Sequence, residues 1–325
     1  MLPALDDLLS RLHVVALPMR MRFRGITVRE VALIDGPAGW GEFGAFPEYP
    51  PEEARHWLAA GIESAYRDLP PARRERIPIN ATVPAVSAAE VAEVLARFPG
   101  AGTAKVKVAE AGQTLSDDIA RVNAVRALIP TVRVDANAGW TVDEAVGAAR
   151  ALTADGPLEY IEQPCRTVAE LTEVRRRVSV PIAADESIRR AEDPLAVVRA
   201  GAADVAVLKV APLGGIAALL AIARRIDVPV VVSSALDSAV GIAAGVAAAA
   251  ALPRLEHACG LGTGRLFGAD VADLTPHDGF LAVDPHVVRV RPDPDRLTAL
   301  AADPARRDWW IARVRTCHAL LASCG

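Results

Sequence analysis

The sequence has few cysteines and no paired cysteine motif. Its 325 residues include only Cys165, Cys259, Cys317 and Cys324, and no two of them form a Cys-x-x-Cys pair. Scattered single cysteines in a chain of this length are typical of reduced thiols rather than of a disulfide framework. The first residues also lack the basic start and apolar core of a signal peptide. We therefore expect a cytoplasmic protein.

Neither a basic excess nor a long apolar run is present. The formal net charge of −4 gives no electrostatic reason to expect a nucleic acid or an anionic membrane as partner. The longest apolar run, from Ala239 to Leu252, has 14 residues and is too short to span a bilayer, so it predicts a buried Ala-rich helix. The length of the chain suits one large α/β domain and a smaller one.

The first 76 residues predict a small α+β domain. A strand pair is expected over 11–35, followed by a glycine turn at 36–39. Residues 40–51 are rich in Gly, Pro and aromatic side chains and predict a structured loop, and a helix is expected over 51–68. The Pro70-Pro71 break places a domain boundary near 73–76.

From residue 77 onward, short apolar runs alternate with amphipathic segments. This alternation predicts a parallel sheet. No GxGxxG motif follows the first strand, which disfavours a dinucleotide-binding fold, and eight strands with seven helices favour a closed barrel over 77–259. The predicted strands are 77–83, 103–108, 132–135, 158–162, 182–185, 205–209, 230–233 and a short one at 255–258, and the helices are 88–98, 116–129, 142–153, 168–178, 193–200, 214–225 and 239–251.

Local signals support this pattern at three helix starts. Ser87, Thr141 and Thr167 are each followed three residues later by Glu, as in a capping box. The remaining residues, 260–325, predict turns, a hairpin over 279–291 and a final helix. We expect this C-terminal segment to pack back on the N-terminal domain, so that both build an α+β cap on a modified (β/α)7β TIM barrel.

A charged residue recurs at the carboxyl end of five successive predicted strands. Lys107, Asp135, Glu162, Asp185 and Lys209 follow one another at intervals of about one βα unit. In a βα barrel these strand ends meet at one mouth, where the chemistry of such barrels takes place. One acid at a strand end is usually a helix cap or a loop anchor. Three such acids flanked by lysines predict a shared site.

The residue types indicate the chemistry of this site. Three converging carboxylates repel one another unless a cation lies between them, and an all-oxygen set favours Mg²⁺, or Mn²⁺, over zinc. Lys107 and Lys209 would face each other across that metal and could remove a proton next to a carboxylate. Lys105 shares a strand face with Lys107, and its charge would lower the pKa of Lys107. Lysines on an exposed edge strand are the alternative.

These residues resemble the enolase superfamily, in its muconate-lactonising-enzyme subgroup. The resemblance rests on Lys105-Val-Lys107, Asp135-Ala-Asn137, Glu162-Gln-Pro164, Asp185-Glu-Ser187 and Lys209, and it covers nearly the whole chain. It implies that Asp135, Glu162 and Asp185 hold Mg²⁺ and that Lys107 is the acid and base. It also implies that Lys209 stays protonated, although the division of donor and acceptor roles between the two lysines stays open.

Within the superfamily, the chain looks most like the o-succinylbenzoate synthases of the actinobacterial type. The segments that carry this likeness are 18–25, 41–49, 209–215 and 233–241. The resemblance implies a hydro-lyase that dehydrates 2-succinyl-6-hydroxy-2,4-cyclohexadiene-1-carboxylate to 2-succinylbenzoate in menaquinone biosynthesis. An N-succinylamino-acid racemase, a dipeptide epimerase or a cycloisomerase would use the same lysines and metal. A metal-binding scaffold without catalysis is the alternative of another class.

Contacts with the substrate are less specific in the sequence. Ser233 and Ser234 end the seventh predicted strand and could bind a carboxylate or make a turn. Arginines from the N-terminal domain could reach a succinyl carboxylate or simply face water, and a glycine cluster could offer backbone amides at the mouth. Asn137 could support the metal or cap a helix, and His257 is expected to be structural. The arginines and glycines in question are Arg20, Arg22, Arg24, Gly260 and Gly262.

Overall fold

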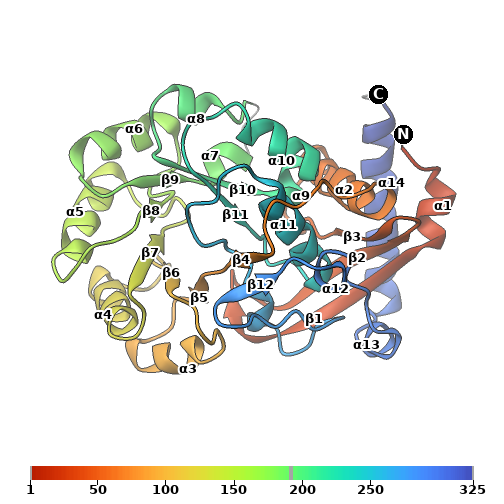
Figure 1. Ribbon diagram of the computed structural model, residues 1–325, viewed down its shortest axis with the longest axis horizontal. Helices are drawn as coiled ribbons and strands as arrows, with labels where there is room; N and C mark the ends of the chain where they lie inside the picture. Colours follow the sequence, from red (N-terminus) through yellow and green to blue (C-terminus); the bar gives the residue numbers. More distant parts are fainter. Residues whose placement is uncertain (1, 190–192, 324–325) are drawn as a thin grey trace.

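The computed structural model describes residues 2–189 and 193–323. Cys324 lies outside these residues, while Cys165, Cys259 and Cys317 are buried free thiols. The structure has an α/β barrel and, beside it, a three-stranded sheet covered by helices (Figure 1).

The N-terminal sheet is antiparallel, in the order β1-β2-β3. Strand β1 spans Leu12–Phe23, β2 spans Ile26–Gly36 and β3 spans Gly39–Phe43, so the segment expected as a loop from residue 40 begins as a strand. The prediction was wrong for residues 40–43 and is confirmed for 44–50. Gly41 serves packing rather than flexibility, because a side chain there would collide with the backbone of Gly61. Helix α2, Pro51–Tyr66, lies against this sheet, and α1 spans Leu5–Ser10.

Seven parallel strands form a curled sheet in chain order. The alternating pattern of apolar runs and helices therefore predicted the barrel correctly, and β10 and β11 have the expected bounds. The predicted first strand is divided, because β4, Arg76–Pro78, pairs instead with the C-terminal strand β12, Phe280–Ala282. The barrel strands are β5 (Ala81–Val83), β6 (Thr103–Lys107), β7 (Thr131–Asp135), β8 (Ile161–Glu162), β9 (Ile182–Ala184), β10 (Val205–Lys209) and β11 (Val230–Ser233).

The eighth strand position is occupied by two residues rather than by the predicted strand at 255–258. Cys259 bridges Ile79 and Gly260 bridges Ser233, both in parallel, and this closes the sheet into a barrel. The predicted residues lie one step too early because their polar groups are engaged at the base of the barrel. His257 bonds Glu159 there, and the Ala258 carbonyl accepts from an arginine.

Helices follow the barrel strands and cover the outside of the sheet (Figure 1). The three predicted capping boxes are present at Ser87, Thr141 and Thr167, and Thr114 with Asp117 forms a fourth. The sequence pattern missed the two four-residue helices α7 and α9. The helices of this region are η1 (Ala88–Glu90), α3 (Val91–Leu95), α4 (Leu115–Arg126), α5 (Val142–Thr153), α6 (Val168–Arg177), α7 (Glu186–Arg189), α8 (Ala196–Arg199), α9 (Val210–Leu213), α10 (Ile216–Ala223) and α11 (Ala239–Ala251).

The C-terminal residues return to the N-terminal sheet. Helix α14, Pro304–Ser323, packs on α2, and Trp310 makes an edge contact with Phe43 at 5.4 Å between ring centroids. No hairpin forms over 279–291, because β12 pairs with β4 instead. The other elements are η2 (Thr263–Leu266), β12 (Phe280–Ala282), α12 (Pro285–Val288) and α13 (Pro294–Ala299).

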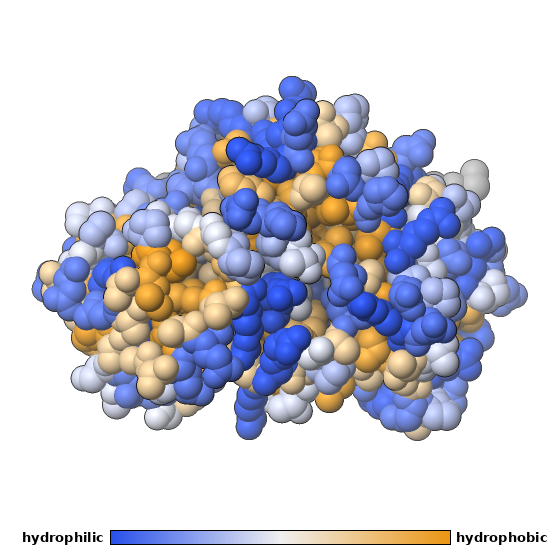
Figure 2. Space-filling view, turned by 60° about the horizontal axis from the view of Figure 1, so that its bottom comes forward, coloured by the Kyte–Doolittle hydropathy of each residue, from blue (hydrophilic) through white to orange (hydrophobic). Residues whose placement is uncertain are grey.

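The apolar run from Ala239 forms the buried helix α11, as predicted. Of the helices in the described residues, none combines the length and the hydropathy that a membrane crossing requires. Hydrophobic patches alternate with hydrophilic side chains over the face drawn in Figure 2.

Candidate active site

Strand register brings the predicted charged residues to one end of the barrel. Lys107 pairs with Asp135 across β6 and β7, and Asp135 pairs with Glu162 across β7 and β8. Asp185 follows β9 directly, and Lys209 ends β10. Because the strands are parallel, all five side chains lie at the same rim.

The lysines and carboxylates at this rim are interleaved. The Lys105 Nζ lies 2.9 Å from Glu162 Oε1 and 3.1 Å from Asp135 Oδ2. The Lys107 Nζ also contacts Asp135, at 2.5 Å, and Lys209 contacts Asp185 at 2.5 Å. Lys105 and Lys107 therefore share a strand face and a carboxylate partner. We name these two lysines, Lys209 and the three acids the mouth layer.

The pKa values of the mouth layer are displaced from their ordinary values. Burial lowers the pKa of Lys107, the charge of Lys105 acts in the same direction, and Asp135 opposes both. Burial also disfavours charge on Lys105, but Glu162 and Asp135 outweigh it and raise that pKa. Burial and the neighbouring Asp135 raise the pKa of Glu162 to about 7, although Lys105 opposes this shift. Of Lys105 and Lys107, Lys107 has the surroundings that favour a neutral amine.

The donor set at the mouth fits a hard divalent cation. Asp135, Glu162 and Asp185 have fully buried carboxylates at the ends of neighbouring strands. Burial and the charge of Asp135 raise the pKa of Glu162, and a bound cation would oppose that shift. In the part of the chain that is described, no three His, Cys, Asp or Glu side chains form a preassembled cage. The Lys105 ammonium lies between Asp135 and Glu162 in this arrangement.

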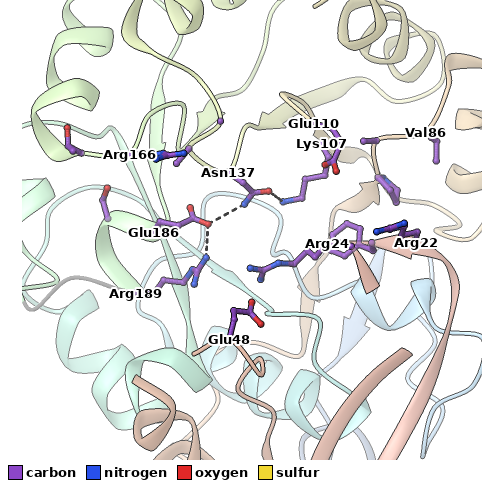
Figure 3. Close-up of a pocket in the computed structure, with 18 of the residues that line it drawn as sticks. Arg22, Arg24, Glu48, Val86, Lys107, Glu110, Asn137, Arg166, Glu186 and Arg189 are labelled. Atoms are coloured by element: carbon purple, nitrogen blue, oxygen red, sulfur yellow. Dashed lines mark hydrogen bonds and ion pairs between the residues drawn. The ribbon is translucent and has the colours of Figure 1, made fainter. Parts of the chain in front are cut away.

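The mouth layer opens into two adjoining cavities. The inner cavity is lined by Lys105, Lys107 and Lys209, together with Ser233 and Gly260. Lys107 and Asn137 also line the outer cavity, which has a volume of about 1000 Å³ (Figure 3). The charged side chains around the outer cavity are Arg22, Arg24, Arg166, Arg189, Glu48, Glu110 and Glu186.

The N-terminal sheet contributes to the same mouth. Phe23, the last residue of β1, lines both cavities, and its ring centroid lies 5.8 Å from the Lys107 Nζ. Arg24 follows it with a backbone φ of 49° and also lines both cavities. The turn between β1 and β2 therefore reaches the proposed acid and base.

Of the residues predicted less firmly to contact the substrate, some line the cavities at the mouth and others do not. Ser233 lines the inner cavity, and its hydroxyl bonds no described residue. Ser234 lines it too, but its hydroxyl lies 2.7 Å from both the Gly260 carbonyl and the Thr263 hydroxyl, so it has a local structural role. Arg20 and Gly262 do not line this site and belong to a separate cavity. Arg20 lies within the irregular stretch of β1 between Pro18 and Phe23.

Sequence reasoning missed several charged residues of the outer cavity, and two of them share one short helix. Glu186 and Arg189 form the short helix α7, directly after Asp185. The Arg189 guanidinium donates from Nε to Asp185 at 3.0 Å and from Nη2 to Glu186 at 2.6 Å. The available signal was the i and i+3 spacing of Glu186 and Arg189 behind a strand-end acid.

Two family profiles match this chain. Residues 87–287 match the family described as "Enolase C-terminal domain-like", and residues 14–65 match "Enolase N-terminal domain-like". The o-succinylbenzoate synthase of Mycobacterium leprae is 73% identical over 325 residues, which cover all of this chain and 96% of that protein. The chain belongs to the o-succinylbenzoate synthase family of the enolase superfamily.

Another relative agrees with this placement, and solved structures agree with the fold. The o-succinylbenzoate synthase of Mycobacterium tuberculosis strain H37Rv is 74% identical over 98% of this chain and 97% of that protein. The muconate lactonizing enzyme of Pseudomonas fluorescens, complexed with muconolactone, has a TM-score of 0.77 at 24% identity over 90% of this chain and 98% of its own. The muconate lactonizing enzyme of Pseudomonas putida has a TM-score of 0.73 at 21% identity, with coverage of 90% and 98%. The structural similarity supports the barrel fold.

Proposed function

We propose that this chain dehydrates 2-succinyl-6-hydroxy-2,4-cyclohexadiene-1-carboxylate to 2-succinylbenzoate, as an o-succinylbenzoate synthase of menaquinone biosynthesis. The observation that carries the proposal is full-length identity of 73–74% to proteins of that name. The mouth layer adds a chemical reason, because it combines a lysine of lowered pKa with buried carboxylates. An isomerase of the same superfamily would share the mouth layer, so the substrate must be tested directly.

Asp135, Glu162 and Asp185 would hold Mg²⁺, or Mn²⁺. When bound, the ion supplies positive charge beside the substrate carboxylate, where charge develops as the α-proton leaves. The three side chains come from adjacent strands, and their carboxylates are already charged or readily ionised near neutral pH. Lys105 would keep its charge and balance the acids next to Lys107.

Lys107 would act first as base and then as acid. Its neutral amine removes the proton from the carbon that bears the carboxylate, and the C–H electrons move onto that carboxylate. The ammonium then gives the proton to the departing ring hydroxyl on the same face. The C–O bond breaks, water leaves, and the ring becomes aromatic. One lysine can serve both steps because both groups leave from one face of the ring.

Lys209 would remain protonated and stabilise negative charge from the opposite side. Its Nζ contacts Asp185, while Lys107 contacts Asp135, so the two lysines flank the row of carboxylates. A cation over the forming aromatic ring is also favourable. Ser233 and the Gly260 backbone lie beside Lys209 in the inner cavity and could receive the second carboxylate.

Parallel assays of two substrates test the function. The purified chain with Mg²⁺ is expected to consume the cyclohexadiene, seen as loss of its ultraviolet absorbance, and to form 2-succinylbenzoate. Treatment with EDTA should stop turnover, and added Mg²⁺ should restore it. No dehydration, together with fast racemisation of an N-succinylamino acid, would show that the chain is a racemase instead.

A further inference from the structure

A chain of hydrogen bonds connects the N-terminal segment to Lys107. The Tyr49 hydroxyl accepts from Arg189 Nη1 at 3.1 Å, and Arg189 Nη2 donates to Glu186 Oε1 at 2.6 Å. The same Glu186 oxygen accepts from Asn137 Nδ2 at 3.3 Å. The Asn137 Oδ1 in turn accepts from the Lys107 Nζ at 2.6 Å (Figure 3). We name this chain of contacts the Glu186 relay.

Glu186 is the branch point of this relay. Its Oε1 atom receives both Arg189 and Asn137, whereas its Oε2 atom is buried without a hydrogen-bond partner among the described residues. A carboxylate that leaves one oxygen unbonded and uses the other twice is not placed for maximal hydrogen bonding. Its position is instead set by the backbone of α7, which begins at Glu186 immediately after Asp185.

Asn137 needs this support because little else holds its side chain. Its backbone has a φ of 44°, in the left-handed region that asparagine tolerates, and its side chain is exposed to the outer cavity. Its backbone nitrogen donates to Asp135 Oδ1 at 3.0 Å, but within the described chain its Nδ2 bonds only Glu186. The amide plane, and with it the direction of Oδ1, is therefore fixed from Glu186.

The orientation of Oδ1 matters because Lys107 has a flexible four-carbon stem. Two contacts determine where its amine lies, one with Asp135 and one with Asn137. If Asp135 holds a metal, its oxygens are shared with that ion. The contact with Asn137 then becomes the more important constraint on the amine.

We propose that Glu186 is a positioning residue that orients Lys107 through Asn137, and that Tyr49 and Arg189 tie this orientation to the N-terminal segment. The inference rests on the proposed function, because it concerns the proton transfer assigned to Lys107. Loss of Glu186 leaves Arg189 bonded to both Asp185 and Tyr49. The effect should therefore fall on proton transfer more than on folding.

Two substitutions at Glu186 separate hydrogen bonding from charge. Glu186→Ala removes the acceptor, and we expect kcat to fall by about 10- to 100-fold with little change in KM, the range for loss of a supporting hydrogen bond. The deuterium isotope effect on kcat, measured with substrate labelled at the α-carbon, should increase because proton removal becomes slower. Glu186→Gln keeps an acceptor oxygen and should retain most of kcat.

A matched control removes a similar pair elsewhere. Glu173 and Arg176 form an i,i+3 ion pair at 3.7 Å on α6, with the same spacing as Glu186 and Arg189. Glu173→Ala should leave kcat, KM and the isotope effect unchanged. The wild-type chain must first turn over the cyclohexadiene; if it does not, the proposed function fails before the relay is tested.

A second variant breaks the relay from the other side. Asn137→Gly keeps the positive φ but removes the amide, and it should lower kcat by a similar factor. The double variant with Glu186→Ala should be no slower than the worse single variant, because both break one link. In an active chain, an unchanged kcat and isotope effect in Glu186→Ala would overturn the inference. Equal losses in the Ala and Gln variants, or multiplying losses in the double variant, would also overturn it.

Discussion

The barrel holds charged side chains in two layers, one at its mouth and one at its base. The base layer consists of Arg133, Glu159, Tyr160 and His257. Arg133 and Asp135 lie two residues apart on β7 and point to the same side of the strand. One strand therefore supplies a charge to each layer, and the two layers can be compared within the same scaffold.

The base layer is enclosed by its own partners. Arg133 is fully buried and donates to Glu159 at 2.8 Å, to the Tyr160 hydroxyl at 2.8 Å and to the Ala258 carbonyl at 2.9 Å. His257 contacts Glu159 at 2.8 Å. Burial would raise the pKa of Glu159, but His257 and Arg133 outweigh it and lower that pKa. These charges stabilise one another and the closure of the barrel.

The mouth layer shares its partners and faces a cavity. Asp135 serves both Lys105 and Lys107, and Glu162 has a pKa raised to about 7. Carboxylates with such partners can bind a metal or a substrate in place of a neighbouring lysine. The difference indicates that charge and burial alone do not define an active site, because both layers have them. The open cavities that its side chains line distinguish the mouth.

The largest effect is expected from Lys107→Ala. Removal of the proposed acid and base should reduce kcat by about 10³-fold or more, within the range for general acid–base catalysis. Thermal unfolding should change little, because Asp135 keeps its contact with Lys105. Turnover by stopped-flow absorbance and unfolding by circular dichroism provide the two measurements. Full activity in this variant would show that the mouth layer, like the base layer, is not needed for catalysis.

The opposite pattern is expected from Arg133→Met at the base. Loss of the buried guanidinium should destabilise the fold by about 1–3 kcal/mol, since the buried Tyr160 hydroxyl and the Ala258 carbonyl lose their donor, whereas Glu159 keeps His257. Chain that remains folded should keep its kcat. Urea unfolding and an active-site titration check the two quantities. A large loss of kcat per folded molecule would place Arg133 in the catalytic site instead.

The pH dependence of metal binding follows from Glu162. Its pKa in the folded chain is about 7, above the ordinary 4.5, so the folded metal-free chain binds the extra proton between these values. The stability that this proton gives is present below pH 4.5 and is lost as pH rises to about 7. Because a protonated carboxyl cannot bind Mg²⁺, affinity should rise by up to about tenfold per pH unit below 7 and then level off.

Calorimetric titration of the metal between pH 5.5 and 8 measures this dependence. Glu162→Gln should bind more weakly and lose most of the slope below pH 7. An identical slope in this variant would assign the titration to another group of the mouth.

Ser233 and Ser234 should show the smallest effects, and opposite ones. Ser234→Ala loses a hydroxyl that is bonded to Gly260 and Thr263, so it should cost about 1 kcal/mol in stability with an unchanged KM. Ser233→Ala should raise KM by about tenfold, because one lost hydrogen bond to a charged group is worth about that much. Unfolding and steady-state kinetics distinguish the two. If Ser234→Ala raised KM and Ser233→Ala lowered stability instead, the roles given to these two serines would have to be exchanged.

The barrel and the mouth layer could be predicted from the sequence because both depend on local periodicity. Strand ends are marked by charge, and three of the helix starts by capping boxes that the structure contains. The eighth strand could not be predicted, because Cys259 and Gly260 are placed by their bridges to Ile79 and Ser233 rather than by their own pattern.

Contacts between segments that lie far apart in the sequence could not be predicted either. Tyr49 meets Arg189 across 140 positions of sequence, and no spacing in the chain indicates that approach. Arg20 was expected at the site because it precedes Arg22 and Arg24 in one strand pattern. Arg20 and Arg22 both lie in the irregular stretch of β1 between Pro18 and Phe23, where the strand pattern no longer fixes side-chain direction, and of the three arginines Arg22 and Arg24 line the outer cavity.

The central claim is that Lys107 moves the α-proton at the mouth of this barrel, and labelled substrate tests it most directly. With Mg²⁺ present, wild-type chain should convert the α-deuterated cyclohexadiene to 2-succinylbenzoate and release the deuterium into water. Lys107→Ala should form product and release deuterium about 10³-fold or more slowly than the wild-type chain, although it still binds Mg²⁺. If the Lys107→Ala variant released deuterium as fast as the wild-type chain does, the account would be contradicted.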